Sequence, residues 1–173
     1  PNSRWYSGAG IYRPVWLYLM PKEHILLNGI RIRTADYRTA RISVSVQTNA
    51  AGNVLIEIMD GEKRVTEANM PANTTTELSV PGGELWSPLS PKLYTCRVTF
   101  GEDVREVAFG IREVRVDAEH GFCLNGERVI LRGACVHHDN GILGAACHPE
   151  AEARKVRLLK ENGYNAIRSA HNP

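Results

Sequence analysis

The sequence predicts a mainly β chain, in which an immunoglobulin-like β-sandwich precedes the first βαβ portion of a truncated (β/α)8 barrel. Three observations support this fold class. About seven short strands, separated by turns, fit into residues 25–112. A helical pattern over residues 150–162 lies between apolar segments at 131–136 and 165–168. Polar side chains follow both segments, at the strand ends where parallel α/β folds form their sites.

Composition and charge argue against two classes of partner. The chain has 173 residues, 43% of them hydrophobic and 23% charged, which suits one or two small globular domains. The net charge is only +2, so there is no electrostatic reason to expect binding to nucleic acid. No apolar run reaches the roughly 18 residues that a membrane span needs. We therefore expect neither a nucleic-acid nor a membrane partner.

The cysteines do not indicate a disulfide scaffold or a metal site. None of the four has a close pairing such as C-x-x-C, and we expect free thiols that are mostly buried: Cys96, Cys123, Cys135 and Cys147.

The chain begins at Pro1 with neither an initiator Met nor a signal peptide, so we expect a piece of a longer protein. Localisation stays unknown, with the cytoplasm slightly favoured over the periplasm.

A single strand is predicted near the start of the chain. Val15, Leu17 and Leu19 alternate with Trp16, Tyr18 and Met20, as they would on a strand with two apolar faces. One strand alone has nothing to pair with, so we expect another domain or another chain to cover it.

Residues 25–112 show the period-two alternation of sandwich strands. Segment 41–48 alternates cleanly, and segments 93–100 and 104–109 pair across a turn that contains Gly101. Asp60-Gly61 is a further hairpin signal. The predicted core consists of Ile42, Val44, Val46, Leu55, Ile58, Leu78, Tyr94 and Val98.

The pattern changes after Arg112. Asn125-Gly126 predicts a hairpin turn between strands at 122–124 and 129–131. Pro149 suits the first turn of the predicted helix, and Gly163 suits its end. A complete barrel needs about 250 residues, so this region can supply only its opening.

Three stretches of the chain carry a resemblance to a known family. Residues 10–17 read Gly-Ile-Tyr-Arg-Pro-Val-Trp-Leu, residues 85–94 and 109–112 include Leu-Trp-Ser-Pro and Phe-Gly-Ile-Arg, and residues 131–139 and 165–173 contain His-His-Asp and Ser-Ala-His-Asn-Pro. Together they resemble glycoside hydrolase family 2, and most closely its β-galactosidase branch. In order, they resemble the end of the family's sugar-binding jelly roll, the last strands of its immunoglobulin-like domain and its first two barrel strands.

The resemblance implies three domains. Residues 1–24 would be the C-terminal tail of the jelly roll, 25–112 the immunoglobulin-like sandwich, and 113–173 the N-terminal part of the TIM-barrel catalytic domain. The order and spacing of the three stretches agree with this arrangement.

The resemblance further implies a retaining β-glycosidase that hydrolyses terminal β-galactosides by a two-glutamate double displacement. The two carboxyl groups of such an enzyme lie about 5 Å apart. The family carries both glutamates on later barrel strands, so we expect them beyond Pro173 and expect this chain alone to be inactive. Glu150, Glu152 and Glu161 are on or just before the predicted helix, and we expect them to be solvated rather than catalytic.

The resemblance also assigns roles to residues at the two strand ends. His137 and His171 match histidines that line the sugar subsite, where an imidazole hydrogen-bonds hydroxyl groups. Asp139 and Asn172 are candidates for hydroxyl contacts or for fixing the histidines. Arg168 would hold a carboxylate of the site in place, with a structural salt bridge as the alternative.

Several other interpretations stay open. Zinc held by His137, His138, Asp139, His148 and His171 is disfavoured, because adjacent histidines on a strand point to opposite faces. We expect no metal or other cofactor in this chain and leave open a divalent cation in the full-length enzyme. A hydrolytic pair of Cys135 with His171 is disfavoured further.

The substrate, the function and the oligomeric state also have alternatives. β-Glucuronides and β-mannosides remain alternative substrates, and a non-catalytic structural or interaction module is the alternative function. A homo-oligomer stays open.

Overall fold

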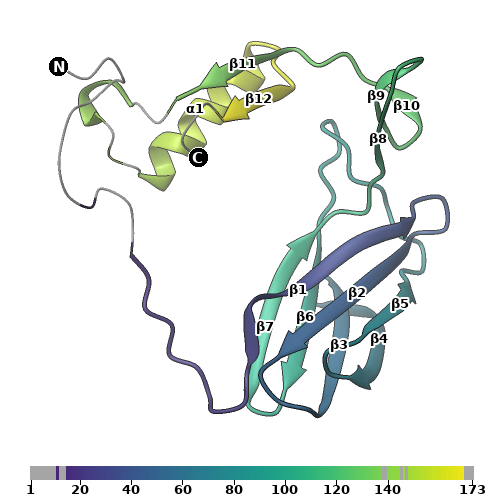
Figure 1. Cartoon of the computed structure of the whole chain (residues 1–173). Coiled ribbons are helices and arrows are strands. Elements are labelled where there is room, and N and C mark those ends of the chain that lie inside the picture. The colour runs from purple at the N-terminus through teal and green to yellow at the C-terminus, as the bar shows by residue number, and fades with distance from the viewer. Residues whose placement is uncertain (1–10, 12–14, 138–139, 145, 147, 170–173) are drawn as a thin grey trace. The chain divides into compact units, whose positions relative to one another are not determined.

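The computed structural model describes residues 11, 15–137, 140–144, 146 and 148–169. The chain divides into two compact units, which are described separately. The larger unit, residues 19–129, contains strands β1 to β10, and the smaller unit contains β11, α1 and β12 (Figure 1).

Two antiparallel sheets form the sandwich of the larger unit (Figure 1). The first sheet has the order β1-β2-β5, with β1 at Ile25–Asp36, β2 at Arg41–Thr48 and β5 at Thr75–Ser79. The second has the order β4-β3-β6-β7, with β4 at Lys63–Pro71, β3 at Asn53–Asp60, β6 at Tyr94–Phe100 and β7 at Asp103–Phe109. These seven strands confirm the predicted mainly β sandwich.

The core lies between the two sheets and is formed by alternate residues of their strands. Seven of the eight predicted core residues are buried there, and the prediction for Leu55 is wrong because Leu55 is only partly buried. On β3 the side chains of Val54, Ile56 and Ile58 are fully buried. Since successive side chains point to opposite faces, Leu55 lies on the other face of the strand.

Two stretches that resemble the glycosidase family lie side by side and pack against the core of the sandwich. Leu85 and Ile111 form a parallel bridge, and the N–H of Trp86 donates to the carbonyl of Ile111 at 2.9 Å. A Cβ at Gly110 would come within 2.7 Å of the Trp86 Cβ, so only glycine allows this close approach. The guanidinium of Arg112 lies 4.5 Å from the Trp86 ring centroid, as in a cation–π contact.

A small antiparallel sheet of order β10-β9-β8 follows the sandwich. Its strands are β8 (Val114–Asp117), β9 (Gly121–Leu124) and β10 (Glu127–Arg128). The Asn125-Gly126 turn joins β9 to β10 with positive φ at both residues, 53° and 82°, which confirms the predicted hairpin. The prediction of a strand at 129–131 is wrong, because the short β10 begins directly after the turn and ends at Arg128.

The predicted strand at residues 15–20 is also wrong. These residues adopt no regular secondary structure, and Leu17 and Leu19 are 88% and 90% exposed. Their alternation suits a strand, but no described strand pairs with them, and backbone groups without a pairing partner do not form a sheet.

The smaller unit is a strand–helix–strand element. β11 (Gly133–Val136) is followed by the short 3-10 helix η1 (Gly141–Leu143), by α1 (Pro149–Glu161) and by β12 (Ala166–Ser169). β11 and β12 are parallel, as predicted. Pro149 occupies the first turn of α1, and Gly163 follows the helix with φ of 83°, in agreement with both predicted boundary signals.

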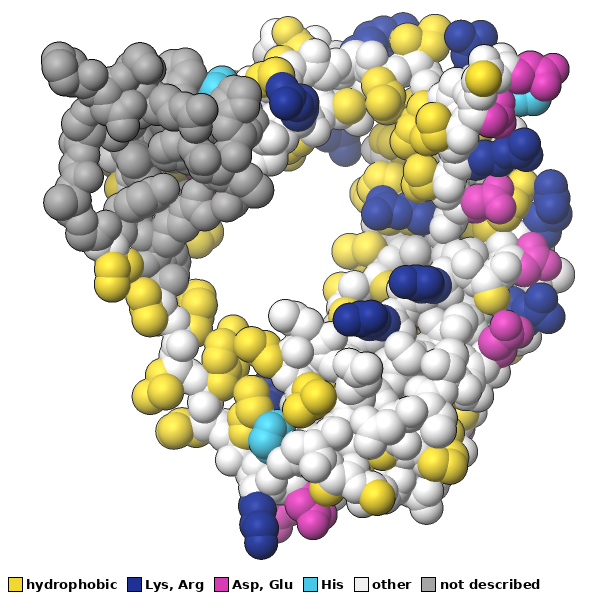
Figure 2. Space-filling model, viewed as in Figure 1, with side chains coloured by type: hydrophobic (Ala, Val, Ile, Leu, Met, Phe, Trp, Pro, Cys, Tyr) yellow, Lys and Arg dark blue, Asp and Glu magenta, His cyan; other side chains and the backbone are white. Residues whose placement is uncertain are grey.

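The visible surface mixes charges of both signs. Figure 2 shows basic and acidic side chains interspersed rather than gathered into one patch, as the net charge of +2 suggests. Among the described helices, none has both the length and the apolar character that crossing a membrane would require.

Candidate functional site

The starts of β11 and β12 are aligned by one asparagine. The side-chain oxygen of Asn165 accepts the N–H of Arg132 at 2.7 Å, and its side-chain nitrogen donates to the carbonyl of Ile130 at 3.0 Å. A Cβ at Gly133 would lie 2.8 Å from the carbonyl oxygen of Ala166, so this glycine permits the close approach of the strands. Asn165 and Gly133 therefore fix the pairing from which the polar residues at the strand ends follow.

The carboxyl ends of the two strands lie at the same edge of the pair. Val136 is opposite Ser169 in the parallel register, and His137 follows β11 directly. Of the predicted sugar-binding residues, only His137 is described; His171, Asp139 and Asn172 lie outside the described residues. Their assignments stay predictions.

Arg168 lies on β12 opposite Cys135 of β11. Its guanidinium Nη1 donates to the Cys135 Sγ at 3.4 Å, and both residues are exposed. The expectation of a buried thiol is therefore wrong for Cys135, whereas Cys96 and Cys123 are buried as expected, and Cys147 lies outside the described residues.

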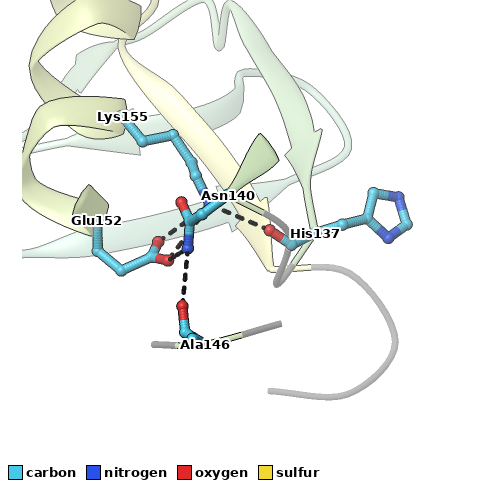
Figure 3. A network of polar contacts seen from close by, with 5 residues as sticks. All are labelled: His137, Asn140, Ala146, Glu152 and Lys155. Atoms are coloured by element: carbon cyan, nitrogen blue, oxygen red, sulfur yellow. Dashed lines mark hydrogen bonds and ion pairs between the residues drawn. The ribbon is translucent and has the colours of Figure 1, made fainter. Parts of the chain in front are cut away.

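A polar network ties the loop after β11 to the first two turns of α1 (Figure 3). The side-chain nitrogen of Asn140 donates to Glu152 Oε1 at 2.8 Å and to the carbonyl of Ala146 at 3.4 Å. The Lys155 ammonium donates to the carbonyl of His137 at 3.2 Å and pairs with Glu152 Oε2 at 3.2 Å. The helix thus holds the loop directly at His137 and at Asn140, and the Asn140 side chain in turn contacts Ala146.

The side chain of Glu152 is 38% exposed and so still contacts water, and it also takes part in this network. The hydrogen bond from Asn140, and then that from Lys155, hold the pKa of the Glu152 carboxyl below its usual value despite partial burial. Sequence spacing alone could have suggested the Glu152–Lys155 pair, which is three residues apart on a helix. Glu150 and Glu161 are exposed, as expected.

The sandwich carries a surface hollow lined by residues that include Trp86, Arg112, Ile32 and Leu93. Aromatic rings often bind sugars by stacking, but here the Arg112 guanidinium already lies over the Trp86 ring. The hollow is therefore a weaker candidate site than the ends of β11 and β12.

The structure offers no support for a metal centre within the residues that it describes. In that part of the chain, no three His, Cys, Asp or Glu side chains lie close enough together to hold a metal ion. His138, Asp139 and His171, which the zinc alternative requires, fall outside the described ranges, so that alternative is untested.

Two family models match successive parts of the chain. Residues 27–112 match the one described as glycosyl hydrolases family 2, and residues 114–173 match the one for the TIM barrel domain of the same family. The boundary between the two matches falls between the sandwich and β8.

Curated relatives and solved structures are similar over nearly the whole chain. The β-galactosidase BoGH2A of Bacteroides ovatus is 36% identical over 100% of this chain and 23% of its own length. The β-glucuronidase of Streptococcus agalactiae is 30% identical over 99% of this chain and 29% of its own length. The crystal structure of a glycosyl hydrolase family 2 member from Bacteroides cellulosilyticus has a TM-score of 0.81 and 34% identity, covering 98% of this chain and 25% of that chain.

The chain therefore spans about a quarter of the length of these relatives. The sandwich, the parallel strand–helix–strand element and the two successive family matches agree with one another along the sequence. This chain belongs to glycosyl hydrolase family 2.

Proposed function

We propose that the protein containing this chain is a retaining β-glycosidase that hydrolyses terminal β-galactosides, and that this chain supplies part of its sugar site. The supporting observation is the parallel pairing of β11 and β12 within residues 114–173, which match the family's TIM barrel domain. Active sites of such barrels lie at the carboxyl ends of the strands. His137 leaves β11 at that end.

The domain boundaries are part of the proposal. Residues 1–24 would end a jelly roll, 25–112 are the immunoglobulin-like sandwich, and 113–173 begin the barrel. The family matches at 27–112 and 114–173 support the last two boundaries.

The residue roles follow from position and chemistry. The imidazoles of His137 and His171 would hydrogen-bond sugar hydroxyls, with Asp139 and Asn172 as further hydroxyl contacts. Arg168, on β12, would orient a carboxylate of the site, because a guanidinium binds carboxylates with a fixed geometry.

The glutamates of α1 are poor candidates for the catalytic pair. A retaining mechanism needs two carboxyl groups about 5 Å apart. Glu150 and Glu161 are at opposite ends of the helix, and Glu150 and Glu152 are two residues apart, a spacing at which side chains do not face each other. We place the pair beyond Pro173. The reaction needs no cofactor from this chain, and a divalent cation or a homo-oligomer in the whole protein stays a prediction.

The choice of sugar has a second candidate. A relative named β-galactosidase, at 36% identity, favours galactosides, whereas relatives named β-glucuronidase, including one at 30%, favour glucuronides. We place galactosides first because of the higher identity and the resemblance of the His-His-Asp stretch.

The test is hydrolysis of nitrophenyl β-galactoside, β-glucuronide and β-mannoside by the full-length protein and, separately, by this chain. We expect the full-length protein to prefer the galactoside and this chain to be inactive. His137→Ala in the full-length protein should lower kcat/KM by about 10- to 100-fold, as for the loss of one strong hydrogen bond.

Preference for the glucuronide would establish the second candidate. A folded full-length protein that hydrolyses none of the three substrates would overturn the proposed β-glycosidase activity. Turnover by this chain alone would contradict the placement of the glutamate pair beyond Pro173.

A further inference from the structure

The loop between β11 and α1 is held at two points by side chains of the helix. At one point Lys155 donates to the backbone carbonyl of His137, the residue directly after β11. At the other point Glu152 accepts from the side chain of Asn140, which itself donates to the carbonyl of Ala146. The helix therefore holds the loop at His137 and at Asn140, and Asn140 connects this part of the loop to Ala146.

The two attachment points are coupled through one ion pair. The Lys155 ammonium lies 3.2 and 3.4 Å from the two carboxylate oxygens of Glu152, so it bridges Glu152 and His137. The Lys155 side chain is only 22% exposed, so its charge is partly withdrawn from water and the pairing is less screened than at an open surface. Loss of either charge weakens both attachment points.

The attachment acts on the backbone of His137 directly and on its ring only through that backbone. Lys155 binds the carbonyl oxygen, while the imidazole is directed away from Lys155 and Glu152 (Figure 3). A fixed carbonyl limits the peptide orientation after β11, and that orientation determines where the ring lies relative to the strand end.

We infer that Asn140, Glu152 and Lys155 are positioning residues, which act as a clamp that fixes the His137 backbone at the end of β11. The inference rests on the proposed function for its meaning in catalysis, because His137 is the sugar contact proposed above. The clamp itself is a feature of this chain and is open to measurement without any enzyme assay.

The first test is NMR spectroscopy of this chain, with the ring signals of His137 assigned from the His137→Gln variant. Lys155→Met should shift these signals and speed amide exchange in residues 140–144 by about tenfold, since a local restraint is lost. Lys155→Arg retains a cationic donor and should restore most of the native spectrum.

A matched control is Lys160→Met, which removes the same charge from the last turn of the same helix. A second pair is Glu152→Gln against Glu150→Gln, which separates the clamp carboxylate from its exposed neighbour. The inference is overturned if Lys155→Met and Lys160→Met leave the His137 signals and loop exchange equally unchanged. It is equally overturned if Lys155→Met unfolds the smaller unit and Lys155→Arg does not restore the His137 signals or the slow loop exchange.

The second test uses the full-length protein with nitrophenyl β-galactoside. Lys155→Met should lower kcat/KM by about tenfold, with Lys155→Arg close to the unchanged protein, because misplacing a contact residue slightly is costly to catalysis. An unaltered kcat/KM for Lys155→Met in an active protein would overturn the catalytic part of the inference. An inactive full-length protein would overturn the proposed function, while the NMR result would still decide whether the clamp exists.

Discussion

The hydroxyl oxygen of Tyr94 accepts a hydrogen bond of 2.8 Å from the backbone N–H of Glu84, ten residues earlier in the chain. Tyr94 begins β6 and is 3% exposed, and its ring lies 5.9 Å from that of Phe109. Immunoglobulin-like sandwiches have a related feature, in which a tyrosine near the start of a strand bonds back to upstream backbone. Here it attaches the segment between β5 and β6 to the core.

Tyr94→Phe should therefore lower the free energy of unfolding by about 1–2 kcal/mol, because the Glu84 N–H loses its acceptor in a partly buried position. Urea denaturation measures the change. Tyr18→Phe is the control, since Tyr18 is 51% exposed, and it should stay within about 0.5 kcal/mol. Equal effects of the two substitutions would show that the hydrogen bond does not stabilise the sandwich.

The two faces of β3 should differ sharply in their contribution to stability. Ile56→Ala removes a fully buried side chain from the core and should cost about 2–5 kcal/mol. Leu55→Ala removes a side chain of similar size from the other face and should cost clearly less. Denaturation of both variants under the same conditions checks the assignment, which fails if Leu55→Ala is the more damaging change.

The described thiols should differ in their rates of alkylation. Cys135 is exposed, whereas Cys96 and Cys123 are buried in the larger unit and react only when the structure opens. We expect Cys135 to be labelled by iodoacetamide at least about tenfold faster than either buried thiol in the native chain. Peptide mass spectrometry after short pulses resolves each cysteine separately, and similar rates for Cys96 and Cys135 would contradict the burial pattern.

Alkaline pH should destabilise the sandwich through Cys96. Burial raises the pKa of this thiol from its ordinary value of 9.0 to about 12. Above pH 9 the unfolded chain releases the thiol proton while the folded chain retains it. The contribution of the Cys96 thiol to the free energy of unfolding is therefore fully present below pH 9 and is lost as the pH rises toward 12.

Cys96→Ala should therefore flatten the alkaline decline of the free energy of unfolding, by up to about 1.4 kcal/mol per pH unit. The comparison concerns the slope, since the substitution also leaves a cavity that lowers stability at every pH. Cys135→Ala, at an exposed position, is the control. Parallel slopes for Cys96→Ala and the unchanged chain would contradict the predicted linkage.

The sandwich was largely predictable because its strands repeat with period two and its turns carry glycine or asparagine. The error at Leu55 arose because Val54, Leu55 and Ile56 are all apolar, so hydrophobicity alone could not identify the inward face. β4 was not predicted as a strand because its residues are mostly polar and only Met70 is buried. It forms because the hairpin from β3 brings it into register.

The candidate site was predictable only in part. The position of His137 follows from the apolar segment that precedes it, and the parallel pairing follows from the helix between two short strands. The contact of Asn140 with Glu152 joins residues twelve positions apart across a loop. Loops have no periodic sequence pattern from which such a contact could be predicted. The strand predicted at residues 15–20 was wrong for a different reason, because a strand-like pattern does not form a strand without a partner strand.

The core of the sandwich is drawn entirely from residues between Ile25 and Ile111. A ribosome thus completes every residue of this core before it adds any residue of β11, α1 or β12. The sandwich can therefore begin to fold during synthesis, as domains that are synthesised earlier generally do. The strands that carry the proposed sugar contacts would then emerge behind a neighbour that is already folded.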